Sequence, residues 1–195
     1  MREYTAASFN QQFRKQPSPV VTHARLAATT SISGPLYALI MAGMIAGAPA
    51  SAQAIDNNAT PQGGKVVGGK ADFNRPANNK LNVDQKSDRA VINWKSFDIG
   101  KDAATQFKQP NSGSLAVNRV TGGGSDPSKI LGQLKANGKL MVLDQNGVFF
   151  GKNAVVDTNG IIASTGDVST AAVMSGSGEI ELSDFGDSAV TNKGR

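Results

Sequence analysis

Short apolar runs separated by glycine-containing turns fill this sequence from residue 62 onward. Runs of about four to six residues with turn signals at this density are typical of an all-β protein. The glycine content of 22 residues and the aromatic content of only 6% favour the same class over a helical one. The candidate strands lie within GGKVVGGKADF, RAVINWKSFDIG, SLAVNRVTGGG, KLMVLD, GVFFG, NAVVDT and GIIAST.

Three Asn-Gly pairs, at residues 137–138, 146–147 and 159–160, lie between these runs. An Asn-Gly pair between two apolar strands is the usual signal of a β-hairpin. The outer two pairs, however, are separated by about one repeat of 20–30 residues that contains several short strands, which suits a parallel β-solenoid. The middle pair is compatible with either arrangement, and the last pair is predicted to be a corner one coil later.

Several runs are continuously apolar instead of alternating, notably LMVL, VFF and VV. Continuous apolar strands are typical of strands buried on both faces. We therefore expect extra strands or a helix to cover part of the coil.

One short helix is predicted near residues 127–136. Asp126 can cap its first turn, and Pro127 suits the first helical position. Its apolar side would consist of Ile130, Leu131 and Leu134. Asn137-Gly138 supplies a stop signal, so the first Asn-Gly pair is predicted to be a helix exit.

The first part of the sequence has the organisation of an export signal. An apolar run at residues 34–50 follows a basic region, and overlapping small-residue cleavage patterns end at Ala52 and at Ala54. A run of this length containing glycine and proline is short for a membrane span. We assign residues 1–54 to an extended signal peptide, with cleavage after Ala54, and residues 55–195 to the exported domain.

The net charge of +5 does not indicate nucleic-acid binding, because most of the excess lies in the leader. No Lys/Arg cluster of the kind that phosphate binding requires stands out after it. The sequence has no cysteine, and its single histidine, His23, also lies in the leader. The mature chain therefore lacks the residues for Ser-His, Cys-His or His-metal chemistry.

The remaining motifs have structural interpretations. Residues 64–71, GKVVGGKA, match a phosphate-binding loop except that alanine replaces the Ser/Thr for Mg²⁺, and a strand corner is favoured. Asp144, Asp157 and Asp167 lack calcium-binding spacing and are interpreted as turn-capping residues. Trp94, the only tryptophan, is interpreted as a core residue. No cofactor, metal or small-molecule substrate is predicted.

Four stretches resemble, in order and spacing, the filamentous haemagglutinin N-terminal domain, also called the haemagglutination activity or two-partner secretion domain. They are INWKSFDIG, QFKQPNSGSLAVNRVTGG, DPSKILGQLKANG and LDQNGVFFGKNAVVDTNGIIAST. The resemblance extends from about Thr60 to about Ser169. It implies a right-handed parallel β-helix, a pectin lyase-like solenoid, with extra-helical strands.

The resemblance also implies a non-enzymatic secretion role. Such a domain directs a large bacterial exoprotein, an adhesin, haemolysin or contact-dependent toxin, to an outer-membrane barrel transporter with POTRA domains. It implies passage through the periplasm and a secreted or cell-surface location. We expect the domain to nucleate β-helix folding, and a downstream passenger to bind any host or cell-surface receptor.

Two short words carry the family's signature in this sequence. The implied secretion-signature residues are Asn118, Arg119, Asp144, Gln145, Asn146 and Gly147. The first two begin the word Asn-Arg-Val, and the last four replace the family's Asn-Pro-Asn-Gly. Asp144 and Gln145 depart from that pattern, and without the proline φ is no longer fixed there.

Two other functions fit the same architecture. One is a secreted β-helix enzyme that degrades polysaccharide, although the mature chain lacks histidine and an evident acidic cluster. The other is a stand-alone adhesive fragment without a transporter. The sequence stops in a turn-like TNKGR, and an open solenoid edge invites strand addition, so we expect the front of a longer protein or a gene remnant.

Overall fold

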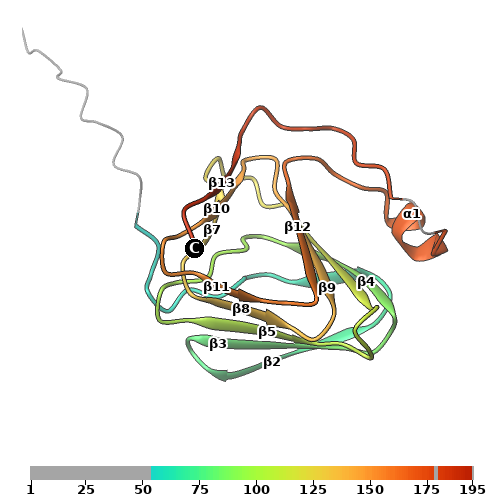
Figure 1. Cartoon of the computed structure of the whole chain (residues 1–195), viewed down its shortest axis with the longest axis horizontal. Coiled ribbons are helices and arrows are strands. Elements are labelled where there is room, and N and C mark those ends of the chain that lie inside the picture. The colour runs from blue at the N-terminus through green and yellow to red at the C-terminus, as the bar shows by residue number, and fades with distance from the viewer. Residues whose placement is uncertain (1–53, 178–179, 195) are drawn as a thin grey trace, which may run out of the picture. The chain divides into compact units, whose positions relative to one another are not determined.

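The computed structural model describes residues 54–177 and 180–194, in which the chain is almost entirely β (Figure 1). The predicted leader lies outside these residues, apart from Ala54. The strands are β1 (Lys65–Gly68), β2 (Ala71–Ala77), β3 (Lys80–Gln85), β4 (Arg89–Trp94), β5 (Ala104–Lys108), β6 (Leu115–Val120), β7 (Ser128–Ile130), β8 (Gln133–Ala136), β9 (Lys139–Leu143), β10 (Val148–Phe150), β11 (Val155–Asp157), β12 (Gly160–Ser164) and β13 (Val190–Asn192). One helix, α1, spans Thr170–Ser175. No helix in the described part is long and apolar enough to cross a membrane.

The strands form three sheets around a common interior. Their orders are β1-β4-β6-β9-β12, β2-β3-β5-β8-β11 and β7-β10-β13. Successive visits of the chain to one face pair in parallel, as Gln133 does with Val155 and Lys139 with Gly160. The chain therefore returns to each face after roughly 20–30 residues, which confirms the predicted parallel β-helix.

The first coil is covered by extra-helical strands, as predicted. β1 pairs antiparallel with β4, and β2 pairs antiparallel with β3. At a bare edge, β3 and β4 would each present unpaired backbone groups. The N-terminal end of the solenoid is thus closed by the segment that precedes it in sequence.

The interior is an apolar core. Its most deeply buried large side chains are Leu81, Ile92, Trp94, Phe97, Ile99, Phe107, Ile130, Leu134 and Leu140. Trp94 is 1% exposed, and the rings of Phe73 and Phe97 lie edge-on to it at 5.3 Å and 5.8 Å. Edge-to-face aromatic contacts at this distance are favourable, and the prediction that Trp94 belongs to the core is confirmed.

A second apolar cluster lies outside the coil. From β9, Leu140 and Val142 point into the interior, whereas Met141 and Leu143 belong to an outer cluster. The segment that covers it, here called the strap, comprises residues 165–177 and 180–189, includes α1, and connects β12 to β13. The LMVL run is therefore buried on both faces, as predicted.

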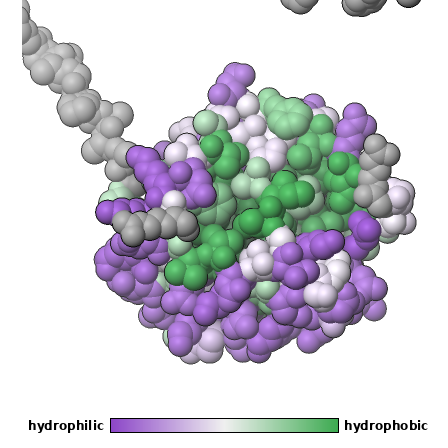
Figure 2. All heavy atoms as spheres, in the orientation of Figure 1, coloured by the Kyte–Doolittle hydropathy of each residue, from purple (hydrophilic) through white to green (hydrophobic). Residues whose placement is uncertain are grey.

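The same expectation is wrong for the VV run. In β11, Val155 is 50% exposed and Val156 is 36% exposed. No further strand lies against β11 on the side away from β8 within the described residues. Figure 2 shows hydrophobic side chains gathered on the face of the molecule where β11 and β12 lie in Figure 1.

The helix predicted near residues 127–136 is wrong, because that segment forms β7 and β8. Ile130 and Leu134 are both fully buried, but they enter the core from two strands on either side of a corner. A Cβ on Gly132 at this corner would lie 2.2 Å from Gly100 O, so only glycine fits. Parallel pairing satisfies the backbone groups that a helix would otherwise have satisfied. The helix that does form, α1, lies in the strap.

None of the three Asn-Gly pairs is a hairpin turn or a helix exit. The first is the corner between β8 and β9, where Asn137 Oδ1 accepts from Gln109 N at 2.7 Å. The second is the turn between β9 and β10. The third is the corner between β11 and β12, where Asn159 Nδ2 donates to Ser112 O at 2.8 Å, and the prediction of a corner one coil later is confirmed.

Candidate functional site

The two signature words lie side by side in the fold. Asn118 and Arg119 are on β6, which pairs in parallel with β9, and they face Val142 and Leu143. The second word begins immediately after β9, at Asp144. The structure therefore brings together all six residues that the sequence indicates, at the end of two neighbouring strands.

Asn118 points into the core and is 0% exposed. Its Oδ1 accepts a hydrogen bond from Trp94 Nε1 at 3.0 Å, and its Nδ2 donates to Met141 O at 3.3 Å. These contacts join three successive coils. A buried amide with its partners in place favours one register of the ladder, because a slip would leave polar atoms without partners.

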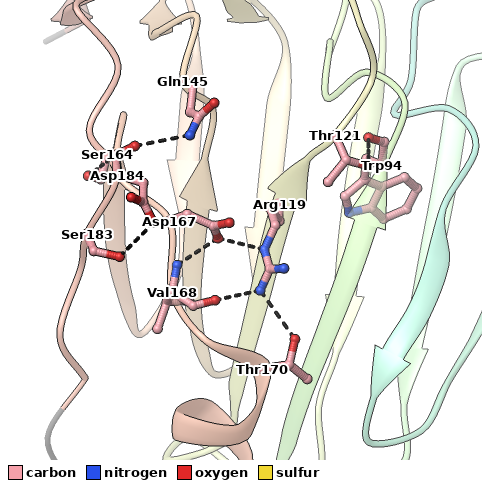
Figure 3. Close-up of polar contacts among 11 residues, drawn as sticks. Trp94, Arg119, Thr121, Gln145, Ser164, Asp167, Val168, Thr170, Ser183 and Asp184 are labelled. Carbon is pink, nitrogen blue, oxygen red and sulfur yellow. Dashed lines mark hydrogen bonds and ion pairs between the residues drawn. The ribbon is translucent and has the colours of Figure 1, made fainter.

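Arg119 points to the opposite face of the sheet and binds the strap (Figure 3). Its Nε lies 2.7 Å from Asp167 Oδ1, and its Nη2 donates to Val168 O at 2.6 Å and to Thr170 Oγ1 at 3.3 Å. The Nε–H direction does not meet hydrogen-bond geometry, so charge is what joins Arg119 to Asp167. The Arg119 side chain is only 16% exposed.

The second word forms a turn held by a buried carboxylate. Asp144 is 2% exposed, and its Oδ2 accepts from Ser128 N at 3.0 Å and from Ser128 Oγ at 2.6 Å. Its Oδ1 accepts from Asn146 N at 2.9 Å, which is the turn-capping role predicted for Asp144. The carboxylate thus joins this turn to the start of β7.

The last two signature positions complete the turn. Asn146 Nδ2 donates to Gly124 O at 2.7 Å and holds the glycine-rich loop before β7. Gly147 has φ of 101°, a conformation that favours glycine. The backbone bond from Gly147 N to Asp144 O, 2.8 Å long, closes the turn without proline. Gln145, where the family has proline, donates from Nε2 to Asp184 O of the strap at 3.0 Å.

A polar cavity of about 300 Å³ lies beside this turn. Its lining includes the carboxylates of Asp98, Asp126 and Asp144 together with Lys95 and Asn146. Burial raises the pKa of Asp98, the neighbouring carboxylates of Asp144 and Asp126 raise it further, and Lys129 opposes the shift. No group of three or more His, Cys, Asp or Glu residues suited to a metal ion occurs in the described ranges.

Sequence reasoning missed Asp98, Ser128 and the strap residue Asp184, and it assigned Asp167 only a turn-capping role. Each acts through a partner that is distant in sequence. Ser128 and Asp144 are 16 positions apart, whereas Gln145 and Asp184 are 39 positions apart. The first offset is shorter than one coil, so coil periodicity does not indicate this pair, and nothing in the sequence indicates the second.

Fold and site together define a β-solenoid with a signature corner that is integrated into its core, the architecture of a secretion domain. The chain belongs to the TPS secretion domain family, whose profile matches residues 53–193. It is therefore a secretion domain of a two-partner exoprotein, and the resemblance found in the sequence is confirmed.

Known proteins similar to the chain agree with this assignment. A heme/hemopexin-binding protein of Haemophilus influenzae strain Rd is 44% identical over 108 residues, which are 55% of this chain and 12% of that protein. A second heme/hemopexin-binding protein of Haemophilus influenzae is 41% identical over 108 residues. The HMW1 secretion domain of Haemophilus influenzae superposes with a TM-score of 0.61 at 35% identity, covering 69% of this chain and 35% of that chain. The chain thus spans only a small part of these relatives.

Proposed function

We propose that this domain is the export address of a longer exoprotein and the nucleus on which that exoprotein folds. Its partner would be an outer-membrane two-partner transporter with periplasmic POTRA domains. Residues 1–54 would serve as a cleaved signal peptide that delivers the chain to the periplasm. The observation that carries the proposal is the contrast between two buried signature side chains, those of Asn118 and Asp144, and the apolar, uncovered C-terminal end of the solenoid.

Burial of two signature side chains, those of Asn118 and Asp144, implies that the transporter reads them before the domain folds. Asn118 and Asp144 are 0% and 2% exposed in the folded chain, so a partner could not contact their side chains there. In an extended chain the same residues are accessible, together with the apolar strands that flank them. Such a segment can add as a strand to an exposed sheet edge of the partner.

The uncovered end suits a templating role after export. Phe150, Val156, Ile161 and Val190 line a depression of about 360 Å³ at the C-terminal end of the solenoid. β13 already extends the third face by pairing in parallel with β10. A further coil would pair with β11 and β12 in the same way and would bury these side chains.

Templating would also give export a direction without nucleotide hydrolysis. In a solenoid each repeat contacts its neighbours, so folding spreads from a stable nucleus one coil at a time. A coil that has folded outside the cell cannot slide back through a transporter that carries the chain unfolded. The free energy of folding would therefore bias movement outward.

We also propose that the domain itself is not an enzyme, and that any receptor is bound by a downstream passenger. Ligand binding named for the heme/hemopexin-binding relatives concerns proteins of which this chain matches 12% and 11%. Incubation of the purified chain with polyuronides tests the enzymatic alternative. Release of unsaturated or reducing ends would contradict the proposal.

Co-expression of the chain with its cognate transporter tests the address. We expect Asn118→Ala and Asn146→Ala each to reduce the amount of chain in the medium several-fold. Asn159→Ala is the matched control, because Asn159 also holds a solenoid corner but lies outside the signature. Unchanged export with both signature variants would remove these residues from the address, and export that is unchanged when the transporter is left out would favour the stand-alone adhesive fragment.

A further inference from the structure

Two of the signature residues bind the strap, and neither contact is part of the solenoid ladder. After β12 the chain leaves the coil, passes over the outer face of β4, β6 and β9, and returns as β13 (Figure 1). An antiparallel bridge between Asp167 and Ser183 joins the two limbs of the strap. The strap is thus a closed loop placed between the second and third strands of the last coil.

The strap covers apolar side chains that would otherwise face water. Val91, Val117, Met141 and Leu143 point outward from the sheet and are at most 3% exposed. The strap residues packed on them are Val168, Val173, Ile180 and Leu182. Burial of this cluster favours the docked strap, but apolar contacts alone do not fix where along the sheet it docks.

Polar contacts fix that position at both limbs. Arg119 holds the first limb through the carboxylate of Asp167 and the carbonyl of Val168 (Figure 3). Gln145 holds the second limb through Asp184 O. Gly186 is pressed against the same turn, since a Cβ there would lie 2.1 Å from Gln145 O.

The held second limb leads directly into β13. Gly186 N donates to Thr165 O at 3.1 Å, and β13 begins at Val190, which pairs with Val148. Few residues separate the anchored limb from this strand, so the anchor limits which register β13 can adopt on β10. Lys193 N donates to Phe150 O at 2.9 Å and continues that register.

We propose that Arg119 and Gln145 are positioning residues that dock the strap, and that strap docking sets β13, the strand that completes the last coil. They act on coil growth through the strap. The proposal rests on the templating role above, because it names the step that completes the coil on which the next one would fold. It also assigns a folding task to two residues that the sequence indicates only as a secretion signature.

The first experiment asks whether Arg119 holds the strap. The purified chain is digested with chymotrypsin, and cleavage after Leu182 and Phe185 in the strap is followed by mass spectrometry. Phe185 is 62% exposed, whereas Phe73 on β2 is 38% exposed and provides an internal reference. We expect Arg119→Ala to raise strap cleavage about tenfold by favouring local opening, with cleavage after Phe73 unchanged. Arg119→Lys keeps the charge opposite Asp167 but loses the forked guanidinium group, so we expect a rate of strap cleavage between those of the unaltered chain and Arg119→Ala.

The second measurement asks whether the strap sets β13. Hydrogen exchange of the Val190–Asn192 amides should rise in Arg119→Ala and in Gln145→Ala, while exchange in β4 and β6 stays the same. Arg75→Ala on β2 is the matched control, because Arg75 bonds to Thr60 and not to the strap. Emission of Trp94 reports whether the core remains folded.

Two results would overturn the proposal: strap cleavage that does not rise, or cleavage that rises while exchange in β13 stays unchanged. If Arg119→Ala unfolds the core, Gln145→Ala alone decides the question, because Gln145 is exposed and contacts the strap from a turn. Both measurements use the purified chain without a transporter. Failure of the export test would therefore leave them intact, and their failure would leave the export address standing.

Discussion

The two ends of this solenoid treat equivalent positions in opposite ways. Leu81, in the first coil, and Val156, in the last, occupy the same inward column, yet Leu81 is 0% exposed and Val156 is 36% exposed. Ala90 and Ile161 form a second such pair, at 0% and 37%. The difference comes from β1 and β2, which cover the first coil, and it makes one end a source of stability and the other a surface for growth.

The edge strands carry the same contrast in their composition. β2 contains Asp72, Arg75 and Pro76, and charged residues and proline on an edge discourage further strand addition. β12, GIIAS, has neither a charge nor a proline, and Ile162 is 51% exposed. A chain with two growing ends would polymerise in both directions, so closing the first end gives the solenoid a polarity.

The largest expected effect separates two inward residues of one column. Leu134 is fully buried, and Leu134→Ala should cost about 2–5 kcal/mol of unfolding free energy through lost burial and a cavity. Val156→Ala, at the paired position one coil later, should cost less than about 1 kcal/mol, because Val156 is already in contact with water. Urea unfolding followed by Trp94 emission measures both. Equal costs would show that the last coil is covered in solution.

The next effect concerns the buried hydrogen bond between Trp94 and Asn118 inside the solenoid. Asn118→Ala removes the acceptor of Trp94 Nε1 and leaves a buried donor without a partner, which should cost about 1–3 kcal/mol. Asn159→Ala, at an exposed corner of the open half, should change stability by less than about 1 kcal/mol. Circular dichroism during urea unfolding gives both values. A cost for Asn118→Ala as small as the control's would remove the register role of Asn118.

A smaller energetic effect, with a visible consequence, concerns self-association. We expect the chain to associate at high concentration through its uncovered end, and the pair Val155→Lys and Ile162→Lys to keep it monomeric while changing stability by only about 0.5 kcal/mol. Asn74→Lys on β2 is the control at the covered end and should associate as the unaltered chain does. Light scattering after size-exclusion chromatography measures the mass, and a monomeric unaltered chain would contradict the expectation.

The strands and corners could be predicted from the sequence, because β-propensity and glycine turns are local signals. RAVINW and KLMVL are strands, and the signature words meet where a coil of this length would bring them. The predicted helix failed for a physical reason: residues i and i+4 share a side in a helix, but Ile130 and Leu134 share an interior across a corner.

The strap could not be predicted, since its contacts span large sequence distances. Arg119 and Val168 are 49 positions apart, and no periodicity marks such a pair. Around Ile180 the strap makes only an isolated bridge and packs by its apolar side chains. Sequence reasoning therefore described the coil and its signature, but it could not show that the signature holds a segment outside the coil.

The smallest expected effect is a pH dependence at Asp98, whose Oδ1 accepts from Lys129 N at 2.8 Å. Burial, then the nearby Asp144 and Asp126 carboxylates, raise the pKa of Asp98 above its usual value of 3.8, although Lys129 opposes them. At pH values between 3.8 and the folded pKa, Asp98 is more often protonated in the folded chain than in the unfolded chain. The contribution of Asp98 to stability therefore falls as pH rises through the folded pKa. Asp98→Asn keeps the acceptor without the charge. We expect it to match the unaltered chain at acidic pH, where Asp98 is protonated in both states, and to unfold at higher urea at neutral pH. Parallel pH profiles of the urea midpoint for the two chains would contradict this expectation, because they would show that the Asp98 charge costs the folded chain no stability.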